Sequence, residues 1–159
     1  MKKELLLNSE VQPAIIPQND DGNAAVAGSI YDLTKFESAL VFASVGAVTG
    51  TPTDLDVTVT IYTGDDVDDE DAPTSITDEA ATTYVLTLSG VQAGSATDFM
   101  NVDLSGLKKW GRVDVELGFT GGTTPTADID AIWVFGDPAY SEEVTDAENV
   151  GTYLEDGEQ

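Results

Sequence analysis

The chain has 159 residues, the length of one ordinary domain, and its 6 Lys and Arg against 30 Asp and Glu give a formal net charge of −24. This excess of negative charge excludes nucleic-acid backbones and anionic membranes as direct partners, because both would be repelled. The absence of Cys and His excludes disulfide bonds, thiolate or imidazole metal sites, and the Ser-His and Cys-His pairs of many hydrolases.

Residues 1–22 are expected to form an extended N-terminal arm, because they contain two prolines and end in the polar turn sequence NDDG. The opening MKKELLLNSE is not expected to be a signal peptide, since Glu4 interrupts its apolar residues. No stretch of the chain is apolar for long enough to predict a membrane-spanning helix.

Seven strands are predicted after the arm, from apolar residues that recur with a period of two. Their ranges in chain order are 24–32, 38–48, 55–63, 83–89, 97–104, 112–119 and 127–135. The alternation is clearest in the third, sixth and seventh of these. Their predicted inward residues are Leu55, Val57, Val59, Ile61, Val113, Val115, Leu117, Phe119, Ile129, Ala131, Trp133 and Phe135.

One of these segments is apolar on both faces, and another is apolar on both faces at its far end. SALVFASV, at 38–45, is therefore expected to be a central strand. In ADIDAIWVF, at 127–135, Ile132 and Val134 lie on the outward face, which predicts cover by another segment or by a partner.

Turn-forming sequences separate the predicted strands, and no helical crossover of 10 to 15 residues lies between them. The sequence therefore favours an all-β fold, an antiparallel β-sandwich that is jelly-roll-like, over a parallel α/β sheet. The β-sandwich domain is expected to span residues 23–138. Residues 139–159 are expected to form an acidic C-terminal tail, with a short helix at 141–149 as an alternative.

The segment TGDDVDDEDAPTSITDEA, at 63–80, crowds acidic residues together with no basic residue. Asp66, Asp68 and Glu70 alternate as the oxygen ligands of Ca²⁺ would, but the mid-loop Gly and the bidentate Glu of a calcium loop are missing. A nucleic-acid mimic would need carboxylates spaced along a rigid surface, whereas run-on aspartates next to Pro73 are typical of a mobile loop.

We therefore interpret the acidic run as a solvated loop and the densest patch of a surface adapted to high salt. Near 1 M salt the Debye length falls to about 3 Å, which screens the repulsion between exposed carboxylates. No metal site and no cofactor are predicted.

Enzymatic activity is not predicted, because a carboxylate pair carries little information in a chain with 30 acidic residues. Trp133 falls on an inward face and is expected in the core, whereas Trp110 lies in the predicted turn LSGLKKWG and can contact a partner. Three of the six basic residues cluster at the same turn, and three leucines lie in the arm. The candidate contact residues are Leu5, Leu6, Leu7, Lys108, Lys109, Trp110 and Arg112.

Two stretches carry a family resemblance. They are YDLTKFESALVFASVGAVTGTPTDLDVTVTIYTGDD, residues 31–66, and VDLSGLKKWGRVDVELGFTGGTTPTADIDAIWVFGDP, residues 102–138. Together they resemble a family of small head proteins of tailed phages and gene-transfer particles. The motifs of that family come in the same order: a "GFES" style strand, "VGAVT", a "DLSGLKRY" turn, an "RV" strand and a last strand ending in Gly-Asp. The acidic stretch 65–80 is longer and more charged than is usual in that family, and the arm and tail have no counterpart in it.

The resemblance implies a structural virion protein that decorates or stabilises an icosahedral head. It also implies the major capsid protein as partner, a homo-oligomer with a trimer favoured, and a location on the capsid exterior after assembly in the host cytoplasm. The acidic composition then suggests a tailed virus of a halophilic archaeon. The alternative is an extracellular carbohydrate-binding or adhesin β-sandwich module, and a hydrolase that uses a carboxylate pair comes third.

Overall fold

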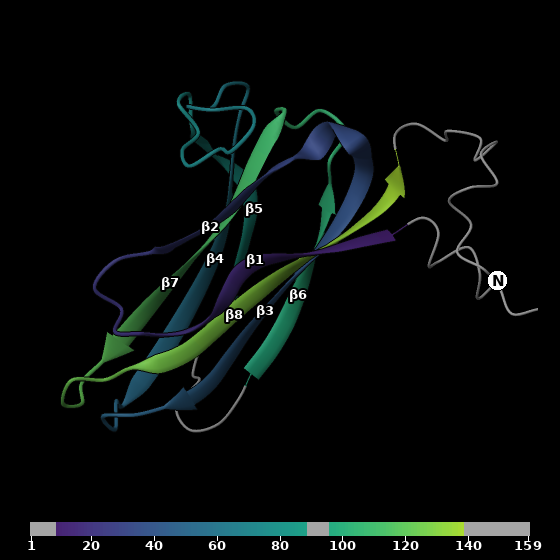
Figure 1. Ribbon diagram of the computed structural model, residues 1–159. Helices are drawn as coiled ribbons and strands as arrows, with labels where there is room; N and C mark the ends of the chain where they lie inside the picture. The colour runs from purple at the N-terminus through teal and green to yellow at the C-terminus, as the bar shows by residue number, and fades with distance from the viewer. Residues whose placement is uncertain (1–8, 89–95, 139–159) are drawn as a thin grey trace, which may run out of the picture.

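The computed structural model describes residues 9–88 and 96–138, which form eight strands and one short 3-10 helix (Figure 1). Within these residues there is no helix with the length and apolarity needed to cross a bilayer. The elements are β1 (Ser9–Asp20), β2 (Val26–Asp32), η1 (Leu33–Lys35), β3 (Phe36–Val48), β4 (Asp54–Gly64), β5 (Ala80–Leu88), β6 (Ala96–Asp103), β7 (Trp110–Thr120) and β8 (Ala127–Pro138).

The strands form two four-stranded sheets that pack face to face. One sheet has the order β1-β8-β3-β6 and the other has the order β2-β7-β4-β5, with all neighbours antiparallel. This is the strand order of an eight-stranded jelly roll. The predicted all-β antiparallel sandwich is confirmed, and so is the central position of β3, which lies between β8 and β6.

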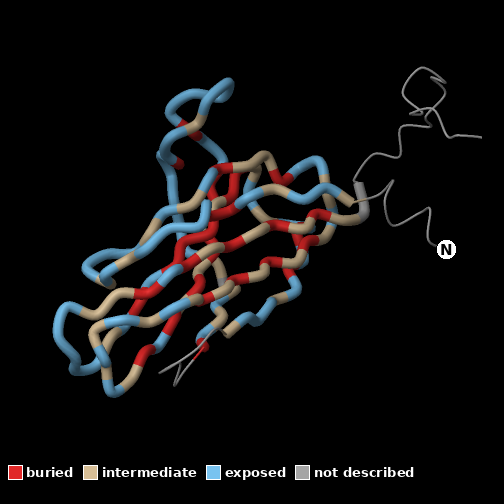
Figure 2. Tube along the Cα trace, turned by 60° about the horizontal axis from the view of Figure 1, so that its bottom comes forward, coloured by how far each residue is buried: buried red, intermediate tan, exposed pale blue. Residues whose placement is uncertain are grey.

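The core lies between the sheets and uses the inward residues that the alternation predicts (Figure 2). In β4, Leu55, Val57, Val59 and Ile61 are completely buried, and Trp133 is completely buried in β8. The predicted inward residues of β7 and β8 are also buried, with the exception of Phe119, which is partly buried near the end of β7.

The structure differs from the expected N-terminal arm, because Ser9–Asp20 forms the edge strand β1 and pairs with β8. Pro13 and Pro17 fit there, since an edge strand can place a residue that lacks an N–H on its unpaired side, and the β1–β8 register shifts twice between Pro13 and Gln18. Residues 1–8 and 139–159, including the alternative helix at 141–149, lie outside the described residues.

Candidate functional site

Residues 65–79, between β4 and β5, form an ordered excursion that we call the acidic lobe, which projects beyond one end of the sandwich in Figure 1. Its two limbs pair through a bridge between Val67 and Ile76. The N–H of Asp68 donates to the carbonyl of Ser75 at 3.1 Å, and that of Thr77 donates to the carbonyl of Asp66 at 3.0 Å. The run is a loop with exposed carboxylates, as predicted for a solvated loop, and these backbone hydrogen bonds tie its two limbs together.

Two aspartates hold the lobe from within. Asp68 Oδ1 accepts the N–H groups of Thr74 and Ser75, both at 2.9 Å, and its Oδ2 accepts the Thr74 hydroxyl. Asp78 accepts the N–H groups of Asp65 and Asp66, both at 3.0 Å. These bonds favour the charged carboxylate, so the pKa of Asp68 is lowered chiefly by Thr74 and that of Asp78 chiefly by the Asp65 N–H.

Lys108 and Lys109, in the turn between β6 and β7, reach back to this lobe. Lys108 pairs with Asp65, and Lys109 Nζ lies 2.7 Å from Glu70 Oε1. Hydrogen bonds to these carboxylates raise the pKa of both lysines. The pairs are exposed, so each contributes little to stability. Both lysine side chains nevertheless lie against the lobe of their own chain.

Arg112 on β7 is held between two carboxylates. Its Nε and Nη2 donate to the two oxygens of Asp114 at 2.6 and 2.9 Å, and its Nη1 lies 2.8 Å from Glu79 Oε2. Its guanidinium also lies over the Tyr62 ring, 5.4 Å from the centroid. The Asp114 hydrogen bond is the main reason that the pKa of Arg112 is raised, and only 12% of the side chain is exposed.

Trp110, the first residue of β7, lies beneath the lobe and is 7% exposed. It packs with Ile30 of β2 and with Val67 and Ile76 of the lobe in a small apolar cluster of its own. Lys109 Nζ lies 4.8 Å from the centroid of its ring, and among the described residues its indole N–H has no acceptor. A side chain that is this buried has little surface for contact with a partner. The structure therefore differs from the expectation that Trp110, in a predicted turn, contacts a partner.

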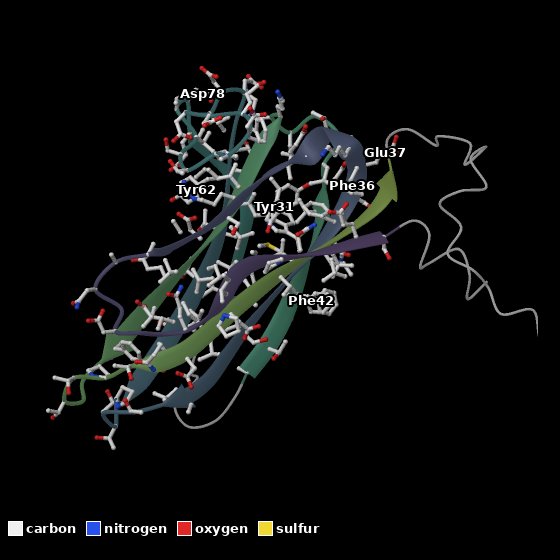
Figure 3. All side chains as sticks on the ribbon, viewed as in Figure 1. Tyr31, Phe36, Glu37, Phe42, Tyr62 and Asp78 are labelled. Carbon is white, nitrogen blue, oxygen red and sulfur yellow. The ribbon has the colours of Figure 1, made fainter. Side chains whose placement is uncertain are left out.

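The structure therefore brings four of the seven candidate contact residues together, but around the acidic lobe of their own chain. They are Lys108, Lys109, Trp110 and Arg112. The lobe residue Asp78 and the neighbouring Tyr62 are visible in Figure 3. The other three candidates, Leu5, Leu6 and Leu7, lie outside the described residues. Each of the three cations, Lys108, Lys109 and Arg112, has a carboxylate partner in its own chain.

The carboxylates that suggested a calcium loop have separate partners. Asp66 accepts the Val67 N–H at 3.1 Å, Asp68 accepts from Thr74 and Ser75, and Glu70 pairs with Lys109. Across residues 9–88 and 96–138, no group of three or more carboxylates is arranged to hold a metal ion.

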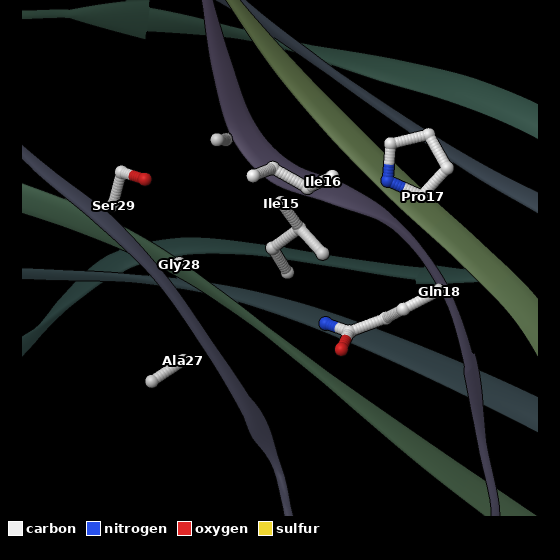
Figure 4. Close-up of a pocket in the computed structure, with 8 residues that line it drawn as sticks. Ile15, Ile16, Pro17, Gln18, Ala27, Gly28 and Ser29 are labelled. Carbon is white, nitrogen blue, oxygen red and sulfur yellow. The ribbon is translucent and has the colours of Figure 1, made fainter.

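A second feature is a groove of about 310 Å³ at the seam between the edge strands β1 and β2 (Figure 4). It opens where both strands have register shifts, and its lining includes Ile15, Ile16, Gln18 and Ser29. The strands approach closely at Gly28, where a Cβ would lie 2.6 Å from the Ala14 carbonyl oxygen. The groove offers apolar walls, one amide and one hydroxyl, a set that suits binding better than proton transfer.

Comparison with known proteins identifies no family for this chain. No family model matches the chain, and no curated protein matches it. Solved structures that it resembles include a Bacillus endospore appendage described as a disulfide-linked pilus, at 12% identity and a TM-score of 0.41, covering 82% of this chain and 89% of that one.

Viral capsid structures are also among these. Infectious bursal disease virus, Gx strain, gives 9% identity and a TM-score of 0.47 over 84% of this chain and 33% of that one, so this chain spans about a third of that protein. The capsid of Helicobacter pylori bacteriophage KHP30 gives 12% identity and a TM-score of 0.38 over 80% and 92% of the two chains.

Proposed function

We propose that this protein is a structural virion protein that decorates or stabilises the icosahedral head of a tailed virus, and that the host is a halophilic archaeon. The observation that carries the proposal is where the two family-like stretches fall in the jelly roll. Residues 31–66 contain β3 and β4, and residues 102–138 contain β7 and β8. These are the four central strands of the two sheets, so the resemblance covers the centre of a fold that recurs in viral capsid proteins.

The hydrogen bonds and ion pairs of the charged groups in and beside the lobe support a structural role without catalysis. Asp68 and Asp78 of the lobe accept hydrogen bonds from backbone N–H groups, and the cations beside the lobe are paired with carboxylates. Such groups stabilise a surface and are not poised to exchange protons near neutral pH. The net charge of −24 suits a particle in molar salt, where repulsion between acidic neighbours is screened.

Attachment to the major capsid protein is proposed to use the leucines of residues 5–7, in an oligomer for which a trimer is favoured. Lys108 and Lys109 can add to this contact only by exchanging their present partners. Trp110 and Arg112 are proposed to act indirectly, because they hold the acidic lobe in place. Weak contacts of this kind add up on a particle with many identical sites.

The test is immunogold electron microscopy on intact particles purified from the culture that carries the gene, with an antibody raised against the folded protein. Label on the heads of tailed particles is expected, with none on particles from a deletion strain. Absence of the protein from purified particles, combined with its presence on cell surfaces, would contradict the proposal.

The alternative is an extracellular carbohydrate-binding or adhesin module, and the groove between β1 and β2 is the observation that favours it. Against it, both tryptophans are buried, Trp110 at 7% and Trp133 at 0% exposure, so neither offers a ring for a sugar to stack on. Binding of the purified protein to a glycan array, abolished by Gln18→Leu, would favour this alternative.

A further inference from the structure

The outer face of the sheet β1-β8-β3-β6 carries an apolar band across its whole width. In one row of the register, Val11 pairs with Val134, Val134 with Leu40, and Leu40 with Asn101. Two residues further along, Pro13 pairs with Ile132, Ile132 with Phe42, and Phe42 with Phe99. The apolar band consists of these eight residues, seven of them apolar and none charged.

The band is open to solvent where it reaches the edges of the sheet. Val11 on β1 is 61% exposed and Phe99 on β6 is 50% exposed. The rings of Phe42 and Phe99 lie 5.5 Å apart at 37°, and Figure 3 shows Phe42 projecting from its strand away from the sandwich. Solvent exposure of two aromatic rings in contact is unfavourable, which marks the band as a surface that gains by being covered.

The outer face of the second sheet is different in kind. Its central strands β4 and β7 place Asp56, Arg112 and Glu116 outward, so charges occupy the middle of that face. On the first sheet the outward acids Asp103 and Asp130 lie in the rows on either side of the band, and the four strands contain no Lys or Arg.

We propose that the apolar band is a self-association surface, on which the same face of a second copy of this chain packs. Two copies that each carry a net charge of −24 can approach closely only where no carboxylate meets another. The band meets itself in such a pairing, because a two-fold axis places the same patch of both copies face to face. Face-to-face packing of sheets about 10 Å apart, with interdigitated side chains, is an ordinary arrangement. This two-fold contact is separate from the trimer favoured for attachment to a capsid, so the inference goes beyond a role in a virion and does not depend on it.

The size of the band sets the strength of this contact. Four strands spaced by about 4.8 Å, over two rows that occupy about four residues of about 3.3 Å along each strand, give a face of roughly 250 Å². A standard stable interface buries about 800 Å² on each partner, so this contact belongs to the weak class. We therefore expect a dimer that forms with increasing concentration rather than a permanent one.

Salt dependence distinguishes a second copy from other occupants. In a dimer the acids in the flanking rows of the two copies come near one another, so screening strengthens the association. A partner that covered the band with a basic rim would bind less tightly as salt is added. Cover by residues 1–8 or 139–159 of the same molecule would leave the protein monomeric.

The experiment is sedimentation equilibrium of the full chain over a concentration series, in 0.1 M and 3 M KCl. Wild type is expected to dimerise, with a dissociation constant at least tenfold lower in 3 M KCl. Val11→Glu and Phe99→Glu place a charge in the band and are each expected to weaken dimerisation at least tenfold in 3 M KCl. Both side chains are at least half exposed, so circular dichroism should show an unchanged fold.

The matched control is Val85→Glu. Val85 lies on the edge strand β5 of the other sheet, pairs with Thr60 and is 55% exposed, so this change adds the same charge to a similar site outside the band. It is expected to dimerise as wild type does. A monomer at every concentration in both salts, or equal weakening by Val85→Glu and Val11→Glu, would overturn the proposal.

Discussion

The Asp68 carboxylate closes the acidic lobe on Thr74, whose backbone N–H and side-chain hydroxyl both donate to it. Asp68→Ala removes this acceptor and leaves the N–H groups of Thr74 and Ser75 to solvent. We expect faster hydrogen exchange at those two amides and unchanged exchange in β4 and β7. Asp71→Ala is the control, because it removes a charge from the same lobe but no carboxylate that accepts a hydrogen bond from a backbone N–H. Equal exchange in the two variants would contradict this role of Asp68.

The hydrogen bonds to Asp68 and Asp78 should make the stability of the lobe depend on pH in the acid range. Both carboxylates have a pKa below the ordinary value of 3.8, so the unfolded chain takes up protons first as the pH falls. Their contribution to stability is therefore complete above about pH 4 and is lost as the pH falls through the lowered values. We expect exchange at the Asp65, Asp66 and Thr74 amides, corrected for its intrinsic pH dependence, to accelerate only below pH 4. Acceleration between pH 5 and 7 would contradict this.

Trp110 is expected to matter for stability through its apolar volume and not through its indole N–H. Trp110→Ala leaves a cavity beside Val67 and Ile76 and should lower the free energy of unfolding by about 3 kcal/mol. Trp110→Phe keeps most of the contact and removes a buried N–H that has no acceptor among the described residues, so its effect should stay within about 1 kcal/mol. Urea denaturation measures both. A large loss in Trp110→Phe would mean that the N–H has a partner.

Replacement of two strand glycines by alanine should change the free energy of unfolding in different ways. At Gly28 a Cβ would lie 2.4 Å from the Val113 carbonyl oxygen and 2.6 Å from that of Ala14, and backbone atoms cannot move aside as a side chain can. Gly28→Ala should cost about 2 kcal/mol or more. At Gly118 a Cβ would lie 3.6 Å from its nearest neighbour, which is ordinary contact. Gly118→Ala should therefore be neutral, or should stabilise the fold by about 0.5 kcal/mol because Ala lowers the conformational entropy of the unfolded chain. Equal melting temperatures for the two variants would contradict the close approach at Gly28.

The excess of carboxylates should make stability depend on salt. Between 0.1 M and 1 M salt the Debye length shortens from about 10 Å to about 3 Å, which weakens the repulsion among exposed acids. We expect the melting temperature to rise with KCl up to 3 M, at a protein concentration low enough to keep the chain monomeric. A melting temperature that does not change over this range would count against adaptation to high salt.

The sequence predicted the strands of the core well, because burial of one face of a strand leaves a period of two that can be read locally. It missed β1, where the prolines of an edge strand look the same as those of a loose arm. It also missed the burial of Trp110, which depends on the lobe between β4 and β5 folding over a residue that follows it by some forty positions. The outward Ile132 and Val134 predicted cover by another segment or a partner, which stays a prediction, but only the register showed that they belong to a band across four strands.

The pairing of β1 with β8 joins the first described strand to the last. Newly made β1 therefore has no neighbour in its own sheet until nearly the whole domain has left the ribosome. At 5 to 20 residues per second this delay is on the order of 10 s. During it, strands rich in Val and Ile are exposed to other nascent chains, and mutual repulsion by a large negative charge is what keeps such chains apart. The net charge of −24 therefore opposes contact between nascent chains before β1 can pair with β8.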